Sequence, residues 1–195
     1  MAQKAEYRSA IRSRRLIREA FLRLLKEKDL NKITVTDIVN YADINRATFY
    51  AHYPDVHGVI REIEDEIIEK MILVLSEFKF KSFFRNPTPL LLKVNRYLEE
   101  DLEFYKTLIL SNGSEIFLER MKRIFSDYMS KDTDVPEEIR NSEAFSLRVC
   151  YFAGGIVNMY KQWFLGNLSC SLNDIPVEVG RIISASAQDL MGVGK

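Results

Sequence analysis

One segment, residues 34–53, constrains the fold of this chain more than any other. It reads TVTDIVNYADINRATFYAHY and contains two short helical patterns on either side of a turn signal. Thr34 has a hydroxyl that can accept a hydrogen bond from the free amides at a helix start, and Asp37 places an acid where the helix dipole favours one. Apolar residues then recur at spacings of three and four up to Ala42, which predicts a buried face on a helix of about two turns.

The second half of the segment predicts a tight turn and another short helix. Asp43 suits a left-handed turn, because Asp tolerates positive φ better than most residues do, and Asn45 is a good cap for the next helix. That helix is expected over Arg46 to His52, with Phe49 and Tyr53 on its inner face. The opposite face then presents small and polar groups that can approach DNA phosphates and base edges closely. The candidate DNA-binding residues are Thr34, Thr36, Asn45, Arg46, Ala47, Thr48, Tyr50 and His52.

The charge of the chain is concentrated at its N-terminal end. Residues 1–26 hold eight basic and two acidic residues, a net charge of +6, although the whole chain has a formal net charge of zero. A basic end on a neutral protein favours nucleic-acid binding, since neutralised phosphates release counterions and supply most non-specific affinity. A solvated basic face without any partner is the alternative interpretation.

The run Thr48-Phe49-Tyr50-Ala51-His52-Tyr53 resembles the end of the recognition helix in the TetR family of transcriptional regulators. The resemblance covers about residues 8–70 and includes the helix that precedes the segment. Two positions depart from the family pattern, because Asp43 stands where Gly is usual and Val56 where many members have a phosphate-binding Lys. The runs YLEEDLEFYKTLI and AGGIVNMYKQWF look like a DhaS-like branch of the family.

The resemblance and the chemistry of the side chains together suggest a role for each DNA-binding candidate. Arg46 and Thr48 are expected to face base edges, and Ala47 a thymine methyl group. Tyr50 and His52 are expected to face phosphates, while the threonines at 34 and 36 anchor the first helix of the pair on the DNA backbone.

The long apolar segments repeat at three and four rather than two, so the predicted fold is all-α. The expected N-terminal domain, residues 1–55, is a three-helix helix-turn-helix head, and residues 56–195 form a helical body for effector binding and dimerisation. About nine helices are expected, near residues 9–26, 35–42, 46–52, 56–78, 90–98, 103–111, 115–130, 138–165 and 173–191.

The body is where the resemblance implies a small-molecule effector. A phenol can both stack and hydrogen-bond inside an apolar pocket, so tyrosines are the preferred candidates, although aromatic residues at helical spacing more often simply fill a core. The candidates for effector contact are Tyr97, Tyr105, Tyr128, Tyr151 and Tyr160.

The last two long helices are expected to form a homodimer, as the resemblance implies. Gly154 and Gly155 lie in an apolar helix, where each costs about 1 kcal/mol relative to Ala unless it serves close packing. That packing is expected between two chains, and an intramolecular contact is the alternative. The candidate interface residues are Gly154, Gly155, Val179, Ile182, Ile183 and Ala187.

Several other classes of protein are not favoured. No run approaches the roughly 18 to 20 apolar residues that cross a bilayer, and the start of the chain has no signal-peptide core, so a cytoplasmic location is expected. Cys150 and Cys170 are expected to be reduced thiols in the core, with no metal site. His52 and His57 are the only histidines and lack partners for catalysis, so neither an enzyme nor a cofactor is predicted.

The function that these observations favour is a dimeric repressor that binds operator DNA through the helix near residues 45–52 and is released by a small-molecule effector. The alternative is a co-regulator of the same fold that acts mainly by binding another protein, which the apolar residue at position 56 motivates.

Overall fold

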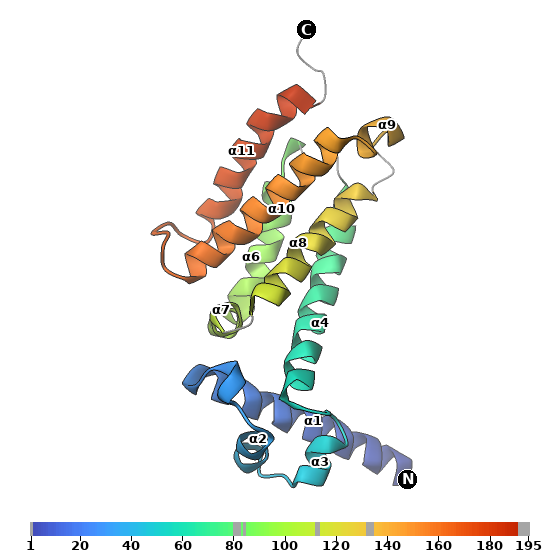
Figure 1. Cartoon of the computed structure of the whole chain (residues 1–195), viewed down its shortest axis with the longest axis vertical. Helices are drawn as coiled ribbons and strands as arrows, with labels where there is room; N and C mark the ends of the chain where they lie inside the picture. The colour runs from blue at the N-terminus through green and yellow to red at the C-terminus, as the bar shows by residue number, and fades with distance from the viewer. Residues whose placement is uncertain (1, 80–82, 84, 112–113, 132–134, 191–195) are drawn as a thin grey trace. The chain divides into compact units, whose positions relative to one another are not determined.

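The computed structural model describes residues 2–79, 83, 85–111, 114–131 and 135–190, and the side chains of residues 2–6 and 186–190 lie outside this description. The described chain contains α-helices and no strand, as predicted, and forms two compact units. One unit comprises Met1–Ile67 with Ser111–Ser114, and the other Ile68–Leu110 with Glu115–Lys195. Figure 1 shows the helices of each unit.

The N-terminal unit holds α1 (Ala2–Glu27), a short 3-10 turn (Leu30–Lys32), α2 (Val35–Ala42), α3 (Arg46–Tyr50) and the first part of α4 (Val56–Ser76). Apolar side chains on one face of α1 pack against α2 and α3, and Ile17, Phe21 and Phe49 are fully buried. Helix α1 begins seven residues before the predicted start at Ser9, and α3 ends two residues before His52.

Two arginines of α1, Arg14 and Arg18, form ion pairs with two glutamates of α4, Glu62 and Glu66. Arg18 donates to both carboxylate oxygens of Glu66 and lies 3.8 Å from Glu62, while Arg14 lies 3.9 Å from Glu62. The two arginines are four residues apart on α1 and the two glutamates four apart on α4, so each set shares one face of its helix. This matched spacing was visible in the sequence, but the two helices are too far apart along the chain for it to have identified the contact.

The C-terminal unit contains the rest of α4 and six further described helices. They are α6 (Thr88–Glu100), α7 (Leu102–Leu110), α8 (Ser114–Ser130), α9 (Glu137–Arg140), α10 (Glu143–Phe164) and α11 (Asp174–Leu190). The predicted helix over 138–165 is two helices, so the described residues form ten α-helices rather than nine. Ser142 causes the division, because its backbone is extended and its hydroxyl accepts a hydrogen bond from the Phe145 amide as the N-cap of α10.

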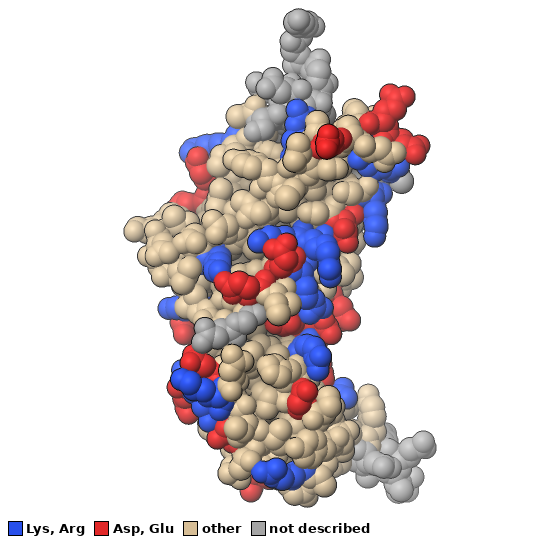
Figure 2. All heavy atoms as spheres, in the orientation of Figure 1, with Lys and Arg blue, Asp and Glu red and all other residues tan. Residues whose placement is uncertain are grey.

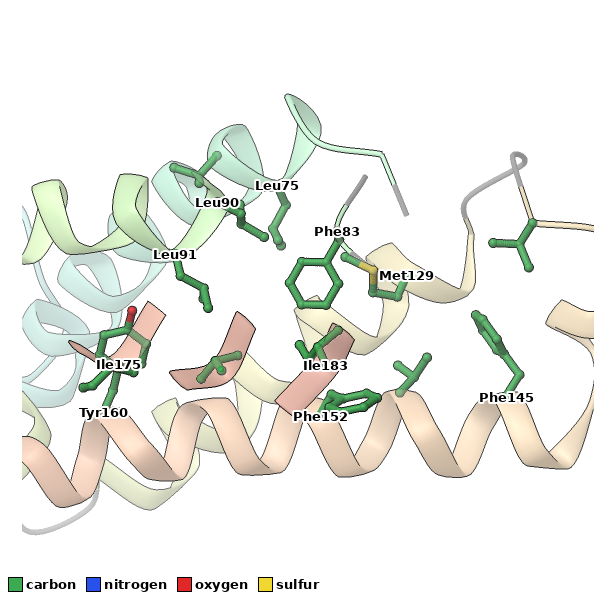
Figure 3. Close-up of a cluster of buried hydrophobic side chains, with 14 of the residues drawn as sticks. Leu75, Phe83, Leu90, Leu91, Met129, Phe145, Phe152, Tyr160, Ile175 and Ile183 are labelled. Carbon is green, nitrogen blue, oxygen red and sulfur yellow. The ribbon is translucent and has the colours of Figure 1, made fainter. Parts of the chain in front are cut away.

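The core of this unit lies between α10 and the helices that face it. Figure 3 shows Phe145, Phe152 and Tyr160 projecting from one face of α10 among side chains of the other helices. Beside Tyr160 there is one buried polar group: the Tyr160 hydroxyl donates to Oδ1 of Asn95, whose Nδ2 donates to the Leu172 carbonyl and to Asn173 Oδ1. These hydrogen bonds hold the loop between α10 and α11 against α6.

Helices α6 and α11 pack against each other, and Gly180 of α11 faces Thr88 of α6. A Cβ atom added at Gly180 would lie 2.6 Å from Oγ1 of Thr88, which is too close for a carbon and an oxygen that share no bond or hydrogen bond. Any larger residue at position 180 therefore forces Thr88 or one of the helices to move, and sequence reasoning did not single this glycine out.

Substituting Gly180 with Ala should lower the free energy of unfolding by about 1 to 3 kcal/mol, because the added methyl group overpacks the α6–α11 contact. Chemical denaturation followed by circular dichroism would measure the change. Adding Thr88→Ala to the variant removes the clashing hydroxyl and should recover part of the loss. A Gly180→Ala variant as stable as the parent would show that the two helices are not in this contact.

Candidate nucleic-acid interface

Helix α2 begins with a reciprocal pair of hydrogen bonds between Thr34 and Asp37. The Thr34 hydroxyl accepts from the Asp37 amide at 3.2 Å, and the Asp37 carboxylate accepts from the Thr34 amide at 2.8 Å. This is a capping box, which satisfies two amides that the helix start would leave unpaired. The Lys28 ammonium lies 2.8 Å from the same carboxylate and, with the Thr34 hydrogen bonds, holds the pKa of Asp37 at about 2.

The turn between the two helices has the predicted conformation. Asp43 has φ 51° and ψ 51°, a left-handed conformation, and is the only non-glycine residue with positive φ in the described part of the chain. Asn45 follows in an extended conformation, and its Oδ1 accepts from the Thr48 amide at 2.7 Å as the N-cap of α3. The predictions for Asp43 and Asn45 are confirmed, and together these residues set the direction of α3.

Helix α3 has the predicted inner and outer faces. Phe49 and Tyr53 are buried, with ring centroids 5.9 Å apart, and hold the helix on the core of the N-terminal unit. Arg46, Ala47 and Tyr50 are exposed on the other side.

The eight candidate residues do not all present free groups to a ligand. The Thr34 hydroxyl belongs to the capping box, and the Asn45 carboxamide oxygen accepts from both the amide and the hydroxyl of Thr48. Thr48 and His52 are half-buried. What remains open at the start of α3 is a surface formed mainly by Arg46, with Tyr50 one turn further on.

The side chain of Arg46 is held from α2. Its Nη2 donates to Oγ1 of Thr36 at 2.6 Å, which links the first turn of α2 to the first turn of α3. A guanidinium group has five N–H donors, so this bond leaves donors for a base edge or a phosphate. Thr36 therefore positions Arg46, a role that the sequence did not reveal because the two residues lie ten positions apart on different helices.

Position 56 contributes no charge to this surface. Val56 is only 8% exposed and packs inside the N-terminal unit. At the same helix start, Asp55 accepts from the Gly58 amide at 2.7 Å and lies 3.7 Å from Arg61, so the neighbouring cation already has an acidic partner.

The five tyrosines proposed for effector contact do not share one environment. Tyr160 and Tyr105 are buried, and burial raises the pKa of both phenols. Tyr128 is half-buried and donates to the Phe78 carbonyl at 3.1 Å, and Tyr97 is half-buried. Tyr151 is 71% exposed on the outside of α10, so the expectation that it lies in a pocket is wrong.

A groove of about 370 Å³ lies on the surface where α8 and α10 meet. Ile116, Leu118 and Val157 form its apolar part, while ion pairs between Lys161 and Glu115 and between Lys122 and Glu119 lie along it. None of the five candidate tyrosines lines this groove.

The six candidate dimer residues divide into two groups. Gly154 and Gly155 are half-buried, and a Cβ atom on either would meet nothing within 4 Å, so the intramolecular alternative is not supported. Val179 and Ile183 are buried in the core of their own unit, which corrects their assignment to an interface. Ile182 is half-buried, and the side chain of Ala187 lies outside the described residues.

Cys150 and Cys170 are free thiols, but both are exposed, so the expectation that they lie in the core is wrong. Cys150 lies beside Tyr151 on the outward face of α10, a face that the sequence pattern could not distinguish from the buried one. Among the described residues there is no group of three or more His, Cys, Asp or Glu side chains that could hold a metal ion. None of the described helices is long and apolar enough to span a membrane.

The family model described as the transcriptional regulator C-terminal region, TetR_C_8, matches residues 85–184, which is more than half of the chain. The chain belongs to the TetR family of transcriptional regulators. The members of this family are regulators of transcription rather than enzymes.

One relative is an uncharacterized HTH-type transcriptional regulator, YxbF, of Bacillus subtilis (strain 168), which is 35% identical over 78 residues. The match covers 37% of this chain and 20% of the relative, so the chain spans about a fifth of the length of that protein.

Solved structures of TetR-family regulators share the fold. A TetR regulator from Streptococcus agalactiae 2603V has a TM-score of 0.68 at 20% identity, covering 93% of this chain and 98% of its own. A putative TetR-family regulator from Syntrophomonas wolfei has a TM-score of 0.69 at 14% identity, covering 90% and 94%. The dihydroxyacetone kinase operon activator DhaS has a TM-score of 0.59 at 18% identity, covering 91% and 97%.

In this TetR-family chain, the capping box at Thr34 should contribute measurably to stability. Substituting Asp37 with Ala removes the acceptor of the Thr34 amide and the partner of Lys28, and should lower the free energy of unfolding by about 1 kcal/mol at neutral pH. Because the folded pKa of Asp37 is depressed to about 2, its contribution is present above the unfolded pKa near 4 and is lost as the pH falls through about 2.

Denaturant titrations at neutral pH and at about pH 2 would measure both effects, since the stabilisation by Asp37 is largely lost only at the lower pH. Asp29→Ala is the matched control, since Asp29 pairs with Lys32 at the surface without capping a helix through its side chain. Its effect should stay below about 0.5 kcal/mol. Equal losses for the two variants would show that the capping box adds nothing beyond an exposed ion pair.

Proposed function

We propose that this chain is a dimeric, ligand-responsive transcriptional regulator that binds operator DNA through α3. The observation that carries the proposal is the outward surface of α3. Arg46 is exposed there and donates a hydrogen bond to Thr36, while the buried Phe49 and Tyr53 pack the opposite side of the helix into the core. A short helix with a buried inner face and a positioned Arg at its start suits the major groove, where Arg binds guanine through two hydrogen bonds.

The remaining exposed groups suit contact with the DNA backbone. The Tyr50 phenol can donate to a phosphate oxygen, and the start of α2, where Thr34 and Thr36 are exposed, can lie against one DNA strand. In this arrangement Arg46 selects sequence, whereas Tyr50 adds affinity without selecting.

The division of roles between Arg46 and Tyr50 can be tested on duplexes recovered by selection from a random-sequence pool. Arg46→Ala should reduce discrimination against single-base changes by about 1 to 3 kcal/mol at one base pair of each half-site. Tyr50→Phe should instead weaken binding to all duplexes by a similar factor. Fluorescence anisotropy on the selected duplex and its single-base variants would measure both.

Thr36→Val serves as the companion variant, because it keeps the shape of Thr36 and removes the acceptor of the Arg46 guanidinium. It should reduce the same base preference in the parent chain and have no further effect in an Arg46→Ala background. If Arg46→Ala and Tyr50→Phe weaken every duplex equally, the assignment of Arg46 to base recognition is wrong.

We propose that two copies associate through the outer faces of α10 and α11. Gly154 and Gly155 leave α10 open for a close approach, and Leu147 and Tyr151 are exposed on the same helix. Figure 2 shows a broad area without charged side chains over α10. An exposed apolar area of this kind on a soluble domain usually marks an interface. A dimer also places two recognition helices on one DNA face, at about 34 Å for adjacent turns of the major groove.

A Gly154→Arg substitution should convert the dimer to a monomer. The chain itself leaves space at this position, so the helical content and the unfolding of each unit should stay close to those of the parent. Sedimentation at micromolar concentration would measure the change in mass, with Ser130→Arg on α8 as a control for added charge. A parent chain that sediments as a monomer would refute the dimer, and a Gly154→Arg variant that stays dimeric would place the interface elsewhere.

We propose that a small-molecule effector of the C-terminal unit releases the DNA, as in a repressor. The effector can do this only by binding a DNA-incompetent arrangement more tightly, and a preference of about 1 to 3 kcal/mol is typical. Helix α4 supplies residues to both units and is therefore the continuous element along which such a preference can act. Tyr97 and Tyr105 remain proposed effector contacts.

The second candidate function is that of a co-regulator that acts mainly by binding another protein. The buried, uncharged Val56 favours it, since a phosphate contact common in the family is missing. The dependence of DNA affinity on salt separates the two functions. A steep loss of affinity with rising salt supports a DNA-binding regulator, whereas failure to enrich any duplex from the random pool supports the co-regulator.

A further inference from the structure

Residues 7–15 of α1 are helical although they bury little side-chain surface. Among the described side chains of α1, Ile17 is the first that is fully buried. Before it, Tyr7 is 68% exposed and Ile11 52% exposed. Helices in proteins owe most of their stability to a packed face, so the roughly three turns of described helix before Ile17 form an exposed surface.

This surface has an apolar row and a basic row side by side. Tyr7 and Ile11 are four residues apart and share one face of the helix, while Arg8 and Arg12, also four apart, lie on the adjacent face together with Arg15. We call residues 7–15 of α1 the basic arm. Like charges four apart on a helix repel each other, so the arm is set up for an anionic partner.

The cations of the arm differ in how far they are neutralised within the chain. Arg14 pairs with Glu62, and Arg15 with Glu19, 3.7 Å away on the same helix. Arg8 and Arg12 are exposed, and neither has an ion pair among the described side chains.

The arm lies in the same compact unit as the recognition helix. Helix α1 packs against α2 and α3, and its N-terminal end continues past α3 in Figure 1. Around the helix pair itself, Lys28 is engaged by Asp37 and Arg61 by Asp55. The two unneutralised arginines of the arm are therefore placed to supply charge where Val56 does not.

We propose that the basic arm is a second DNA-binding surface, which contacts the phosphates of duplex DNA flanking the base pairs read by α3. This inference rests on the proposed function. Arg8 and Arg12 are about 6 Å apart along the helix axis and can each bind a phosphate of one strand, while the Tyr7 phenol donates to a third or stacks on a sugar. The contacts add affinity and extend the footprint but read no bases.

Duplex DNA fits the arm better than an anionic membrane does. A helix that binds in the membrane interface needs a continuous apolar face along its length, and among residues 7–15 only Tyr7 and Ile11 are large apolar residues. The helix-turn-helix in the same unit is proposed to bind DNA, which would place DNA phosphates near the arm. No other described feature of the chain indicates that a membrane lies there.

The test compares the full-length parent with Arg8→Ala/Arg12→Ala on two duplexes, the selected sequence with 12 bp flanks and the same sequence trimmed to its core. Removing two phosphate contacts should reduce the slope of log affinity against log salt by about 1.8 on the flanked duplex. Between about 50 and about 200 mM salt, the variant should then lose about tenfold less affinity than the parent. Trimming should weaken the parent and leave the variant unchanged, with base preferences equal in both.

Arg96→Ala/Arg123→Ala is the matched control, since it removes two exposed arginines from the C-terminal unit and changes net charge equally. A basic-arm variant with the same slope as this control would overturn the proposal. So would a variant that loses only binding to phosphatidylserine vesicles, because that outcome assigns the arm to a membrane. A parent that binds no duplex at all refutes the proposed function itself, whereas a parent that binds both duplexes equally refutes only the arm.

Discussion

The left-handed backbone of Asp43 is the constraint on which the recognition surface depends. A single residue with positive φ reverses the chain between α2 and α3, and the angle between these helices determines whether α3 lies on the surface with its polar side outward. An L-residue with a Cβ atom holds this conformation at some cost, which an Asp bears more easily than most. The cost is offset because Phe49 and Tyr53 then reach the core.

Much of the helix pair could be predicted because its signals are local. The cap at Thr34, the turn at Asp43 and the cap at Asn45 each depend on residues within four positions, and all three were legible in the sequence. The packing between α6 and α11 was not legible. Gly154 and Gly180 look alike in a helical pattern, yet Gly154 faces open space and Gly180 faces Thr88, which lies on another helix much earlier in the sequence. Only the tertiary structure distinguishes the two glycines.

The same distinction explains the errors in the C-terminal unit. Tyr151 and Tyr160 both lie on α10, but nine residues of helix turn one outward and the other into the core. Val179 and Ile183 belong to the apolar stripe of the last helix, which is why the sequence predicts an interface there. The structure buries this stripe in the core of the helix's own unit. Apolar periodicity identifies a helix face that must be buried, but it does not indicate whether that face packs against the same chain or against a second one.

The hydrogen bonds of Asn95 limit how this unit can change during evolution. Its carboxamide joins the Tyr160 hydroxyl to the loop between α10 and α11, and Asn95, Tyr160 and Leu172 are buried. Replacing Asn95 alone leaves the Tyr160 phenol and the Leu172 carbonyl without partners, and replacing Tyr160 by an apolar residue as well removes the first penalty but not the second. A change at position 95 is therefore tolerated more readily when position 160 changes with it, which ties the sequence of α6 to that of α10 across an otherwise apolar core.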